Sequence, residues 1–506
     1  MSVSFSTSKN GEETCIIDST YIHSRYAPSN EIKRWVDSIQ CDFKPLFVFV
    51  IAPGIPYCSS FFKDKFPDAK LILLHFFREF EKYDSTSFLS LYYKNELTAV
   101  DFSEMLFDYF GEEVASRILF VSYKPCENLL QSQIKTVFEG ISLYLKKSRD
   151  VIATRTFFSK KWFLNTVRFF KNIHAPYRYN SQKLTCDVLI AASGPTLKDS
   201  LPYVIQYRSR FFLLAVSSSV NCLIENNIIP DLVISTDGGY WAKKHLEILE
   251  KNRDIPLCIS CESALPYSAY QNRIVPINYD DFLENALFKL SDIDSINLSR
   301  NGTVSGNALE IALKLTNKNV YMVGVDLQSG KGFPHSQPNV LENFDKLRDF
   351  KLSNTETRIT KRNVFSSSLE VYKNWFSSIE KEKACRIKRL CIKTKALPDL
   401  GFIKTCFWEN INFSENDFVT ENKFEFLFEK QSFSNKNDKI KDFLVKLSKE
   451  IELLDEKSHS LKEYDEIFKM FSLGHYLHFQ KFSDSSSFQN AKDDVLSCLE
   501  KGIKAL

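Results

Sequence analysis

The middle of the chain, residues 176–415, alternates short apolar runs with segments in which apolar residues recur every three or four positions. Such runs predict buried strands, and such segments predict amphipathic helices. The predicted strands span residues 187–192, 212–217, 231–236, 256–260, 274–277 and 319–325. The predicted helices span residues 197–207, 220–226, 241–251, 282–290 and 304–315. Regular alternation predicts an α/β fold with a central doubly wound, mainly parallel sheet, which binds ligands at the carboxyl ends of its strands.

The chain before this region has a related pattern. Two apolar runs, at residues 47–52 and 68–75, flank a helix-like segment, which predicts a βαβ unit within an N-terminal α/β module over residues 1–175. Helical spacing follows at residues 126–147 and 157–172. The turn Pro53-Gly54 has one glycine where a dinucleotide fingerprint needs three. We therefore expect this module to support the central domain or to contact proteins, without a bound cofactor.

The last part, residues 416–506, is rich in charged residues and phenylalanine. Leu444, Leu447, Ile451 and Leu454 fall at helical spacing. This pattern predicts a C-terminal helical region whose apolar stripes form core or oligomer contacts. The sequence leaves the oligomeric state open.

Composition narrows the class of protein. The 506 residues are 44% hydrophobic and 25% charged, with a net charge of +3, which is typical of a globular protein and argues against a nucleic-acid partner. No apolar stretch near the start is long enough to span a membrane, and no secretory leader is recognisable, so we expect a cytoplasmic protein. The 12 cysteines are scattered, and Cys258 and Cys261 lie in an apolar run, which predicts buried strand cysteines and no zinc site.

The first candidate motif follows the strand predicted at residues 187–192. Ser193, Gly194, Pro195 and Thr196 form a tight turn into a helix, and unpaired N–H groups at a helix start favour a phosphate. The motif is not a Walker loop. An ordinary strand-to-helix turn is the alternative interpretation.

Further polar residues follow other predicted strands. Ser217 and Ser218 are candidates to line a pocket or to cap a helix, and Asp237 is a candidate to bind a hydroxyl or a metal. Gly302, Thr303, Ser305 and Asn307 lie at the start of a predicted helix. Asp326 ends a predicted strand, and His335 lies in the loop after it. A lone loop histidine is usually solvent-facing. Here it lies close after a strand-end carboxylate, so His335 is a candidate general base.

These motifs, read in order, resemble a known family. The order GPTL, a serine-rich strand end, IIPDLVISTD, NGTVSGNALEIAL and VYMVGVDLQSGKGFPHS is similar to motility accessory factors, glycosyltransferase-like proteins of flagellin modification. The resemblance covers residues 160 to 345. The family's GPSL is GPTL here, and its glycine-rich N-terminal turn is reduced to Ala52-Pro53-Gly54. The central pattern also resembles bacterial sialyltransferases and 6-hydroxymethylpterin pyrophosphokinases.

The resemblance implies a Rossmann-like, sialyltransferase-like domain that transfers a nonulosonic acid, pseudaminic or legionaminic, from a CMP-linked donor to serine or threonine of flagellin. It implies that Gly194, Pro195 and Thr196 hold the nucleotide phosphate, with Ser193 in the same turn, while Ser217 and Ser218 line the nucleotide pocket. Gly302, Thr303, Ser305 and Asn307 would contact nucleotide or sugar. His335 would accept the acceptor proton, with Asp326 orienting its loop and Asp237 as the next candidate. No metal or cofactor is implied.

Two other functions stay open. A pterin pyrophosphokinase would need magnesium, with Asp237 and Asp326 as candidate ligands. A flagellin-binding or assembly protein would keep the fold without catalysis, because fold does not fix function.

Overall fold

The computed structural model describes residues 1–94, 96–328, 330–361, 363–364, 367–393, 396–411, 423–432 and 437–506. The chain divides into two compact units, residues 1–159 with 451–497 and residues 160–450 with 498–506. This division differs from the three expected parts. The first boundary lies inside a helix and not at residue 175, and the C-terminal residues divide between the two units. The expected boundary at residues 415–416 lies outside the described residues.

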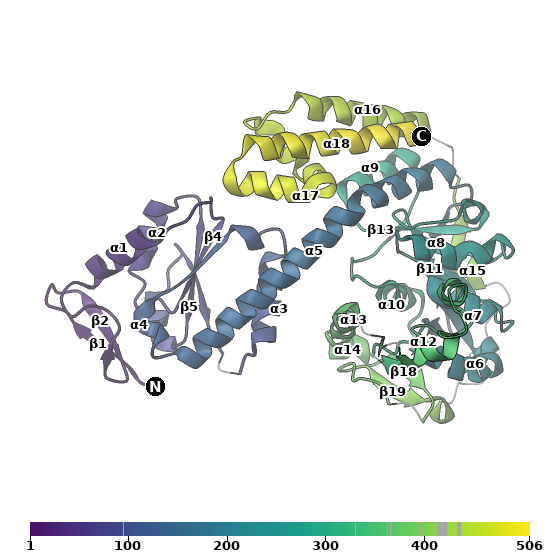
Figure 1. Ribbon diagram of the computed structural model, residues 1–506, viewed down its shortest axis with the longest axis horizontal. Helices are drawn as coiled ribbons and strands as arrows, with labels where there is room; N and C mark the ends of the chain where they lie inside the picture. Colours follow the sequence, from purple (N-terminus) through teal and green to yellow (C-terminus); the bar gives the residue numbers. More distant parts are fainter. Residues whose placement is uncertain are drawn as a thin grey trace. The chain divides into compact units, whose positions relative to one another are not determined.

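The first unit contains a four-stranded parallel sheet in the order β6-β5-β4-β7, of which β4 and β5 are labelled in Figure 1. Its strands are β4 (Phe47–Ile51), β5 (Lys70–His75), β6 (Leu89–Tyr92) and β7 (Ile118–Ser122). The expected βαβ unit is present, with α2 (Cys58–Lys65) between β4 and β5. The His23 side chain packs against the Pro53-Gly54 turn that follows β4. Its Nε2 accepts a hydrogen bond from the Ile55 N–H at 2.8 Å and lies 2.4 Å from where a Cβ on Gly54 would be.

The two helical segments expected at residues 126–147 and 157–172 are wrong as separate elements. One helix, α5, runs over Gln131–Asn172 without a break (Figure 1). The residues between the two segments, 148–156, contain neither proline nor glycine, so nothing in the sequence ends the helix there. The helix belongs to both units.

The second unit is built on a nine-stranded sheet in the order β14-β13-β12-β11-β10-β9-β15-β18-β19, with every neighbouring pair parallel. The strands are β9 (Asp187–Ala191), β10 (Phe211–Val216), β11 (Leu232–Ser235), β12 (Leu257–Ser260), β13 (Ile274–Asn278), β14 (Ile296–Asn297), β15 (Val320–Val323), β18 (Ile387–Cys391) and β19 (Lys404–Phe407). The helices between them include α6 (Thr196–Gln206), α7 (Val220–Ile224), α8 (Tyr240–Leu246), α9 (Phe282–Ser291) and α10 (Val304–Leu315). All six predicted strands and all five predicted helices are present.

The strand order identifies the switch point. The chain moves outward from β9 to β14, then returns to place β15 on the other side of β9. With right-handed crossovers, this order puts helices on both faces of the sheet and confirms the doubly wound prediction. The carboxyl ends of β9 and β15 therefore form the edge where such sheets bind ligands.

The core of the second unit comes from the strands themselves. Every residue of β9 and β10 is buried, as is usual for a parallel sheet covered on both faces. Cys258 and Cys261 are buried free cysteines, but only Cys258 lies in a strand, β12, because that strand ends at Ser260.

The C-terminal region is helical, as predicted, with α16 (Asn437–Leu453), α17 (Asp465–Phe482) and α18 (Ser485–Ala505). Leu444, Leu447, Ile451 and Leu454 are all buried. Among the described helices, none combines the length and the apolar character needed to cross a membrane.

Candidate functional site

The ends of β9 and β15 lie unusually close together. The Ala192 N–H donates to the Val323 carbonyl at 2.9 Å, and the Gly194 N–H donates to the Gly324 carbonyl at 2.8 Å. A Cβ on Gly324, which has a φ of +69°, would lie 2.2 Å from the Ala192 oxygen. A Cβ on Gly194 would lie 2.5 Å from the Gly324 oxygen. Gly194 has no left-handed φ, so this turn needs glycine for close packing and not for the conformational freedom expected from the sequence.

The start of α6 is capped by a carboxylate of this chain. Asp326 accepts a hydrogen bond from the Thr196 N–H at 2.9 Å and another from the Thr196 hydroxyl. The next N–H groups, of Leu197 and Lys198, donate to the carbonyls of Gly194 and Pro195. The expected phosphate cradle at Gly194, Pro195 and Thr196 is therefore wrong in its geometry. Its N–H groups are engaged, and a buried carboxylate there repels a phosphate.

Three predicted residues meet beside this turn. Nδ1 of His335 lies 2.9 Å from Oγ of Ser193, which accepts a hydrogen bond from the Ser218 hydroxyl at 2.8 Å. The Ser336 N–H donates to the Ser193 carbonyl at 2.7 Å, and Nδ2 of Asn339 donates to the Ser218 carbonyl at 3.1 Å. The segment after β15 is thus anchored across the ends of β9 and β10, which holds the half-buried His335 at the switch point.

A second histidine, which sequence analysis missed, lies against His335. His245 on α8 is 5% exposed, and its ring centroid is 6.3 Å from that of His335, with the rings nearly perpendicular. Burial, followed by the neighbouring His335, lowers the pKa of His245 to about 4, so its ring is neutral at neutral pH. One sequence feature could have predicted the burial of His245: it shares the apolar face of its helix with Ala242 and Leu246.

The polar residues of α10 divide into two kinds. Asn307 is buried, and its side chain accepts hydrogen bonds from Thr236 at 3.2 Å and Tyr279 at 3.1 Å while donating to the Ser299 carbonyl at 2.9 Å. It therefore joins the ends of neighbouring strands. Gly302 is exposed, and Thr303 and Ser305 are half-buried in the first turn of the helix.

The two remaining predicted residues follow β10 and β11. Ser217 is buried in the short 3₁₀ turn after β10. Asp237 is exposed after β11, two strands from β9, and its carboxylate accepts a hydrogen bond from the Gly239 N–H at 2.6 Å.

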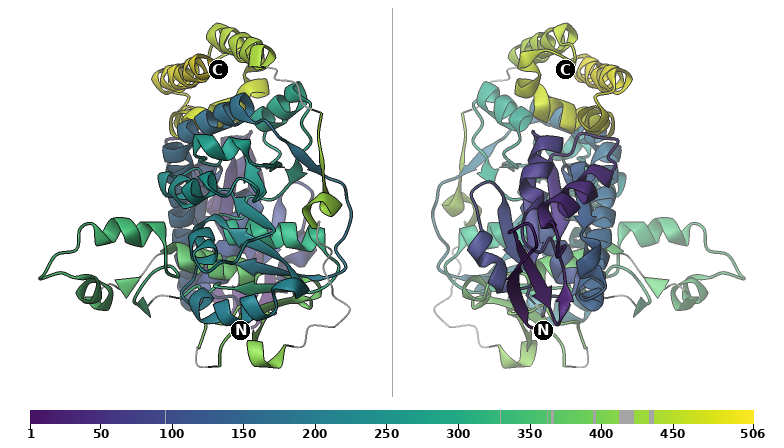
Figure 2. Two further views of the ribbon diagram at one scale, coloured as in Figure 1. Left: turned by 90° about the vertical axis from the view of Figure 1, so that its right-hand side faces the viewer. Right: turned by 90° about the vertical axis from the view of Figure 1, so that its left-hand side faces the viewer.

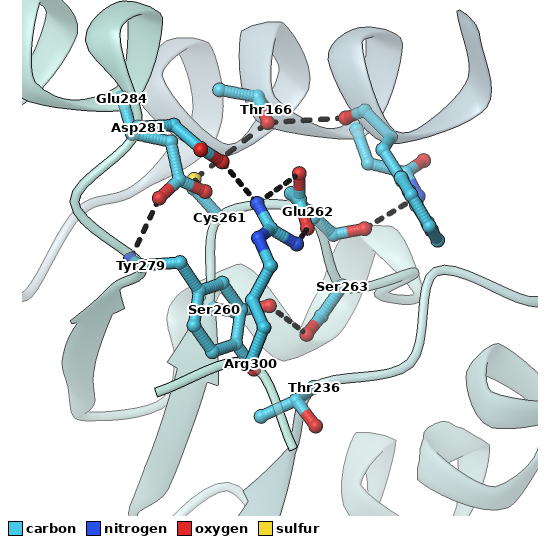
Figure 3. Close-up of polar contacts among 12 residues, drawn as sticks. Thr166, Thr236, Ser260, Cys261, Glu262, Ser263, Tyr279, Asp281, Glu284 and Arg300 are labelled. Carbon is cyan, nitrogen blue, oxygen red and sulfur yellow. Dashed lines mark hydrogen bonds and ion pairs between the residues drawn. The ribbon is translucent and has the colours of Figure 1, made fainter. Parts of the chain in front are cut away.

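A charged cluster that sequence analysis also missed lies after β12, β13 and β14 (Figure 3). The Arg300 guanidinium donates to both carboxylate oxygens of Glu262, at 2.8 and 3.0 Å, and to Asp281. It also lies over the Tyr279 ring, 4.5 Å from the centroid. A fourth member, Glu284, is buried and accepts hydrogen bonds from the Tyr279 N–H at 2.8 Å and the Cys261 thiol at 3.0 Å. Each member of the cluster follows a strand, and this position after a strand is the sequence feature that could have identified it.

The chemistry of this cluster is set by its crowded carboxylates. Burial, followed by the nearby Glu262 charge, raises the pKa of Glu284 to about 7. Oxygens of Glu262, Asp281 and Glu284 lie within 4.8 Å of one another, a spacing that could hold a metal ion. Arg300 supplies one positive charge to Glu262 and Asp281, so the cluster keeps a net negative charge even when Glu284 is protonated.

Comparisons with known proteins agree with this architecture. Residues 161–332 match the family described as 6-hydroxymethylpterin diphosphokinase MptE-like. An uncharacterized protein of Treponema pallidum (strain Nichols) is 30% identical over 333 residues, covering 65% of this chain and 71% of the relative. A second uncharacterized protein of that organism is 22% identical over 249 residues, covering 48% of this chain and 41% of the relative.

One solved structure shares the fold of nearly the whole chain. The MAf glycosyltransferase from Magnetospirillum magneticum AMB-1 superposes with a TM-score of 0.58 at 11% identity, covering 99% of this chain and 90% of that chain. At that identity the likeness concerns the fold. Because the chain covers 71% of the first treponemal relative at 30% identity, it belongs to the same protein family as that relative, a family that is motility accessory factor-like in fold with an MptE-like central domain.

Proposed function

We propose that the chain is a glycosyltransferase of the motility accessory factor type, which transfers a nonulosonic acid from a CMP-activated donor to serine or threonine hydroxyls of flagellin. The observation that carries the proposal is the contact between Nδ1 of His335 and Oγ of Ser193, at 2.9 Å, on the carboxyl edge of the parallel sheet. A neutral histidine whose ring is oriented by a hydrogen bond at Nδ1 is suited to accept a proton from a substrate hydroxyl.

In the proposed reaction, the acceptor oxygen forms a bond to the anomeric carbon of the sugar. The bond from that carbon to the phosphate oxygen breaks, and CMP leaves with the bonding electron pair. The acceptor proton passes to Nε2 of His335, while Ser193 and Ser218 hold the ring through Nδ1. Because His335 must be neutral to accept this proton, the neutral His245 beside it adds no positive charge that would disturb its orientation.

We place the donor phosphate at the start of α10 and not at the start of α6. The first N–H groups of a helix have no intrahelical partner, and the helix dipole favours an anion there. The half-buried side chains of Thr303 and Ser305 add two hydroxyl groups in that turn. The Thr303 N–H at this helix start donates to the neutral amide oxygen of Asn301 at 3.1 Å, whereas the start of α6 is occupied by the carboxylate of Asp326. Asn307 would act by holding the strand ends and not by touching the nucleotide.

The second candidate is a magnesium-dependent pterin diphosphokinase, which the MptE-like match of residues 161–332 favours. Of its two candidate metal ligands, Asp326 is buried and bonded to Thr196, and Asp237 is exposed. Asp237 follows β11 and Asp326 follows β15, and two further strands, β10 and β9, lie between these two strands in the sheet. Because Mg²⁺ prefers several oxygen ligands clustered in an octahedron, this placement disfavours the diphosphokinase. A non-catalytic flagellin-binding protein is the third candidate.

The discriminating experiment is a calorimetric titration of the purified protein with CMP, UMP, AMP and ATP, with and without Mg²⁺. We expect CMP to bind at least about tenfold tighter than the other nucleotides, without a magnesium requirement, and we expect Ser305→Ala to weaken it. Tighter ATP binding with Mg²⁺, followed by turnover with a pterin acceptor, would favour the diphosphokinase. Absence of any nucleotide preference would favour the non-catalytic candidate.

A further inference from the structure

Residues 340–361 form a projecting arm whose apolar side chains face solvent. The arm contains α11 (Val340–Lys346) and α12 (Thr355–Lys361), and it projects from the second unit as a green segment in both views of Figure 2. Leu347, Phe350 and Leu352 are 81%, 62% and 83% exposed. Large apolar side chains gathered on one exposed segment mark an interaction surface.

Charged side chains join the two helices of the arm. The guanidinium of Arg358 on α12 donates to Glu342, which is buried, and to Asp349 at 2.8 Å, and it lies 3.6 Å from Asp345. This network joins the two helices without using the apolar residues between them. The apolar side chains are therefore left on the outside of a segment that is already folded, which lowers the entropy lost when a partner binds.

The same network leaves the outer surface of the arm basic. Three of its carboxylates, on Glu342, Asp345 and Asp349, are turned toward Arg358. The exposed cationic residues are Lys346, Arg348, Lys351 and Lys361, against one exposed acidic residue, Glu356. A complementary partner carries apolar and acidic side chains.

The arm is continuous with the candidate catalytic residue. It begins directly after Asn339, which is bonded to the Ser218 carbonyl beside His335. At its base, Phe344 contacts Trp241 with ring centroids 5.5 Å apart, and Trp241 is on α8, the helix that also carries His245. A polypeptide bound along the arm would therefore lead to His335.

We propose that the arm is the docking surface for the acceptor polypeptide, binding a segment of the acceptor that carries apolar and acidic side chains and presenting a nearby hydroxyl to His335. This inference rests on the proposed function, because it assigns the acceptor of that same site. A single serine or threonine hydroxyl offers little binding energy, so a protein acceptor needs a contact of this kind outside the reacting group.

The test compares flagellin binding by the full chain and by a Leu347→Ser/Leu352→Ser variant, using unglycosylated flagellin of the same organism immobilised for interferometry. Leu453→Ser is the matched control, because Leu453 is equally exposed, at 85%, and lies outside the arm. We expect the double variant to weaken flagellin binding at least about tenfold, with CMP binding unchanged and with the control like wild type. A Lys346→Glu/Arg348→Glu variant should weaken binding most at low salt.

Three results would overturn the inference. Equal flagellin binding by wild type and the double variant would remove the arm from the interface while leaving the proposed function intact. Wild-type protein that binds CMP but no flagellin would instead contradict the proposed acceptor, and the arm's role with it. A wild-type dimer that becomes a monomer in the double variant, by light scattering, would assign the arm to self-association.

Discussion

At the scale of single residues, the proposed sugar transfer depends on His335. Replacing His335 with Gln keeps a similar size and polarity but removes the base, so turnover should fall by about 10²- to 10⁴-fold. The affinity for CMP should change by less than about twofold, because the proposed phosphate contacts are on α10. The measurements are initial rates of CMP release with flagellin and calorimetric titration with CMP.

A matched control is His459→Gln, since His459 is exposed in a different unit of the chain. It should have wild-type turnover. Equal turnover in the His335 variant and in this control would remove His335 from the chemistry, and Asp237 would be the next candidate base.

Part of the site could be predicted from sequence because its residues follow strands. Ser193, Ser218 and His335 each come after an apolar run, and the parallel sheet brings such positions to one edge. The pairing of Asp326 with Thr196 could not be predicted, because 130 residues separate them and a free helix start has the same sequence pattern as a capped one. Without that contact, the sequence pattern at the start of α6 is typical of a phosphate site.

At the scale of elements, the junction of β9 and β15 should be sensitive to a single methyl group. Gly324→Ala places a Cβ at 2.2 Å from a carbonyl oxygen at a φ of +69°, so we expect it to destabilise the chain by at least about 2 kcal/mol. Gly302→Ala is the matched control, because Gly302 has a φ of +76° with no atom within 4 Å of its Cβ. It should cost about 1 kcal/mol.

Urea denaturation of both variants gives the comparison. A cost for Gly324→Ala no larger than that for Gly302→Ala would mean that the strand ends separate without penalty, and the close junction would lose its structural role.

The elements that sequence analysis found are those with continuous apolar runs. β9 and β10 are buried along their whole length, so composition alone reveals them. β18 was missed because it contains Arg389, which is buried and donates to the Thr405 hydroxyl and the Pro398 carbonyl. β14 was missed because it is two residues long. A buried arginine interrupts the apolar run that would predict a strand, and a strand of two residues is too short to produce such a run.

At the scale of the whole molecule, the C-terminal residues could not be assigned to a unit from their pattern. Ile467 and Phe471 are buried in the structure, and helical spacing does not predict which residues cover such positions. In the structure, Lys469 pairs with Glu113 at 2.9 Å, and the Lys44 N–H donates to the Lys481 carbonyl, so residues 451–497 complete the first unit. Contacts between residues this far apart in the chain follow from the folded topology.

Buried neutral histidines should make both units sensitive to acid. Burial lowers the pKa of His23 to about 3 and of His75 to about 4 in the first unit, and lowers that of His245 to about 4 in the second. The unfolded chain binds these protons near pH 6.5 and the folded chain does not, so their contribution is fully present above pH 6.5. It is lost as the pH falls toward 4, by about 1.4 kcal/mol per histidine and pH unit.

Urea midpoints measured from pH 7.5 to pH 4.5 test this dependence. His75→Phe, which keeps an aromatic ring against Phe80 and Tyr92, should flatten the pH dependence of the first unit, whereas the exposed His459→Gln should not. Stability that stays constant across this range would contradict neutral burial of the three histidines.

Sugar transfer to flagellin is tested by the intact mass of flagellin after incubation with the purified chain and CMP-pseudaminic or CMP-legionaminic acid. We expect a mass increase of one or more sugar residues on flagellin, matched by an equal amount of released CMP and lost with His335→Gln. Unchanged flagellin mass with both donors, under conditions in which CMP and flagellin bind, would contradict it.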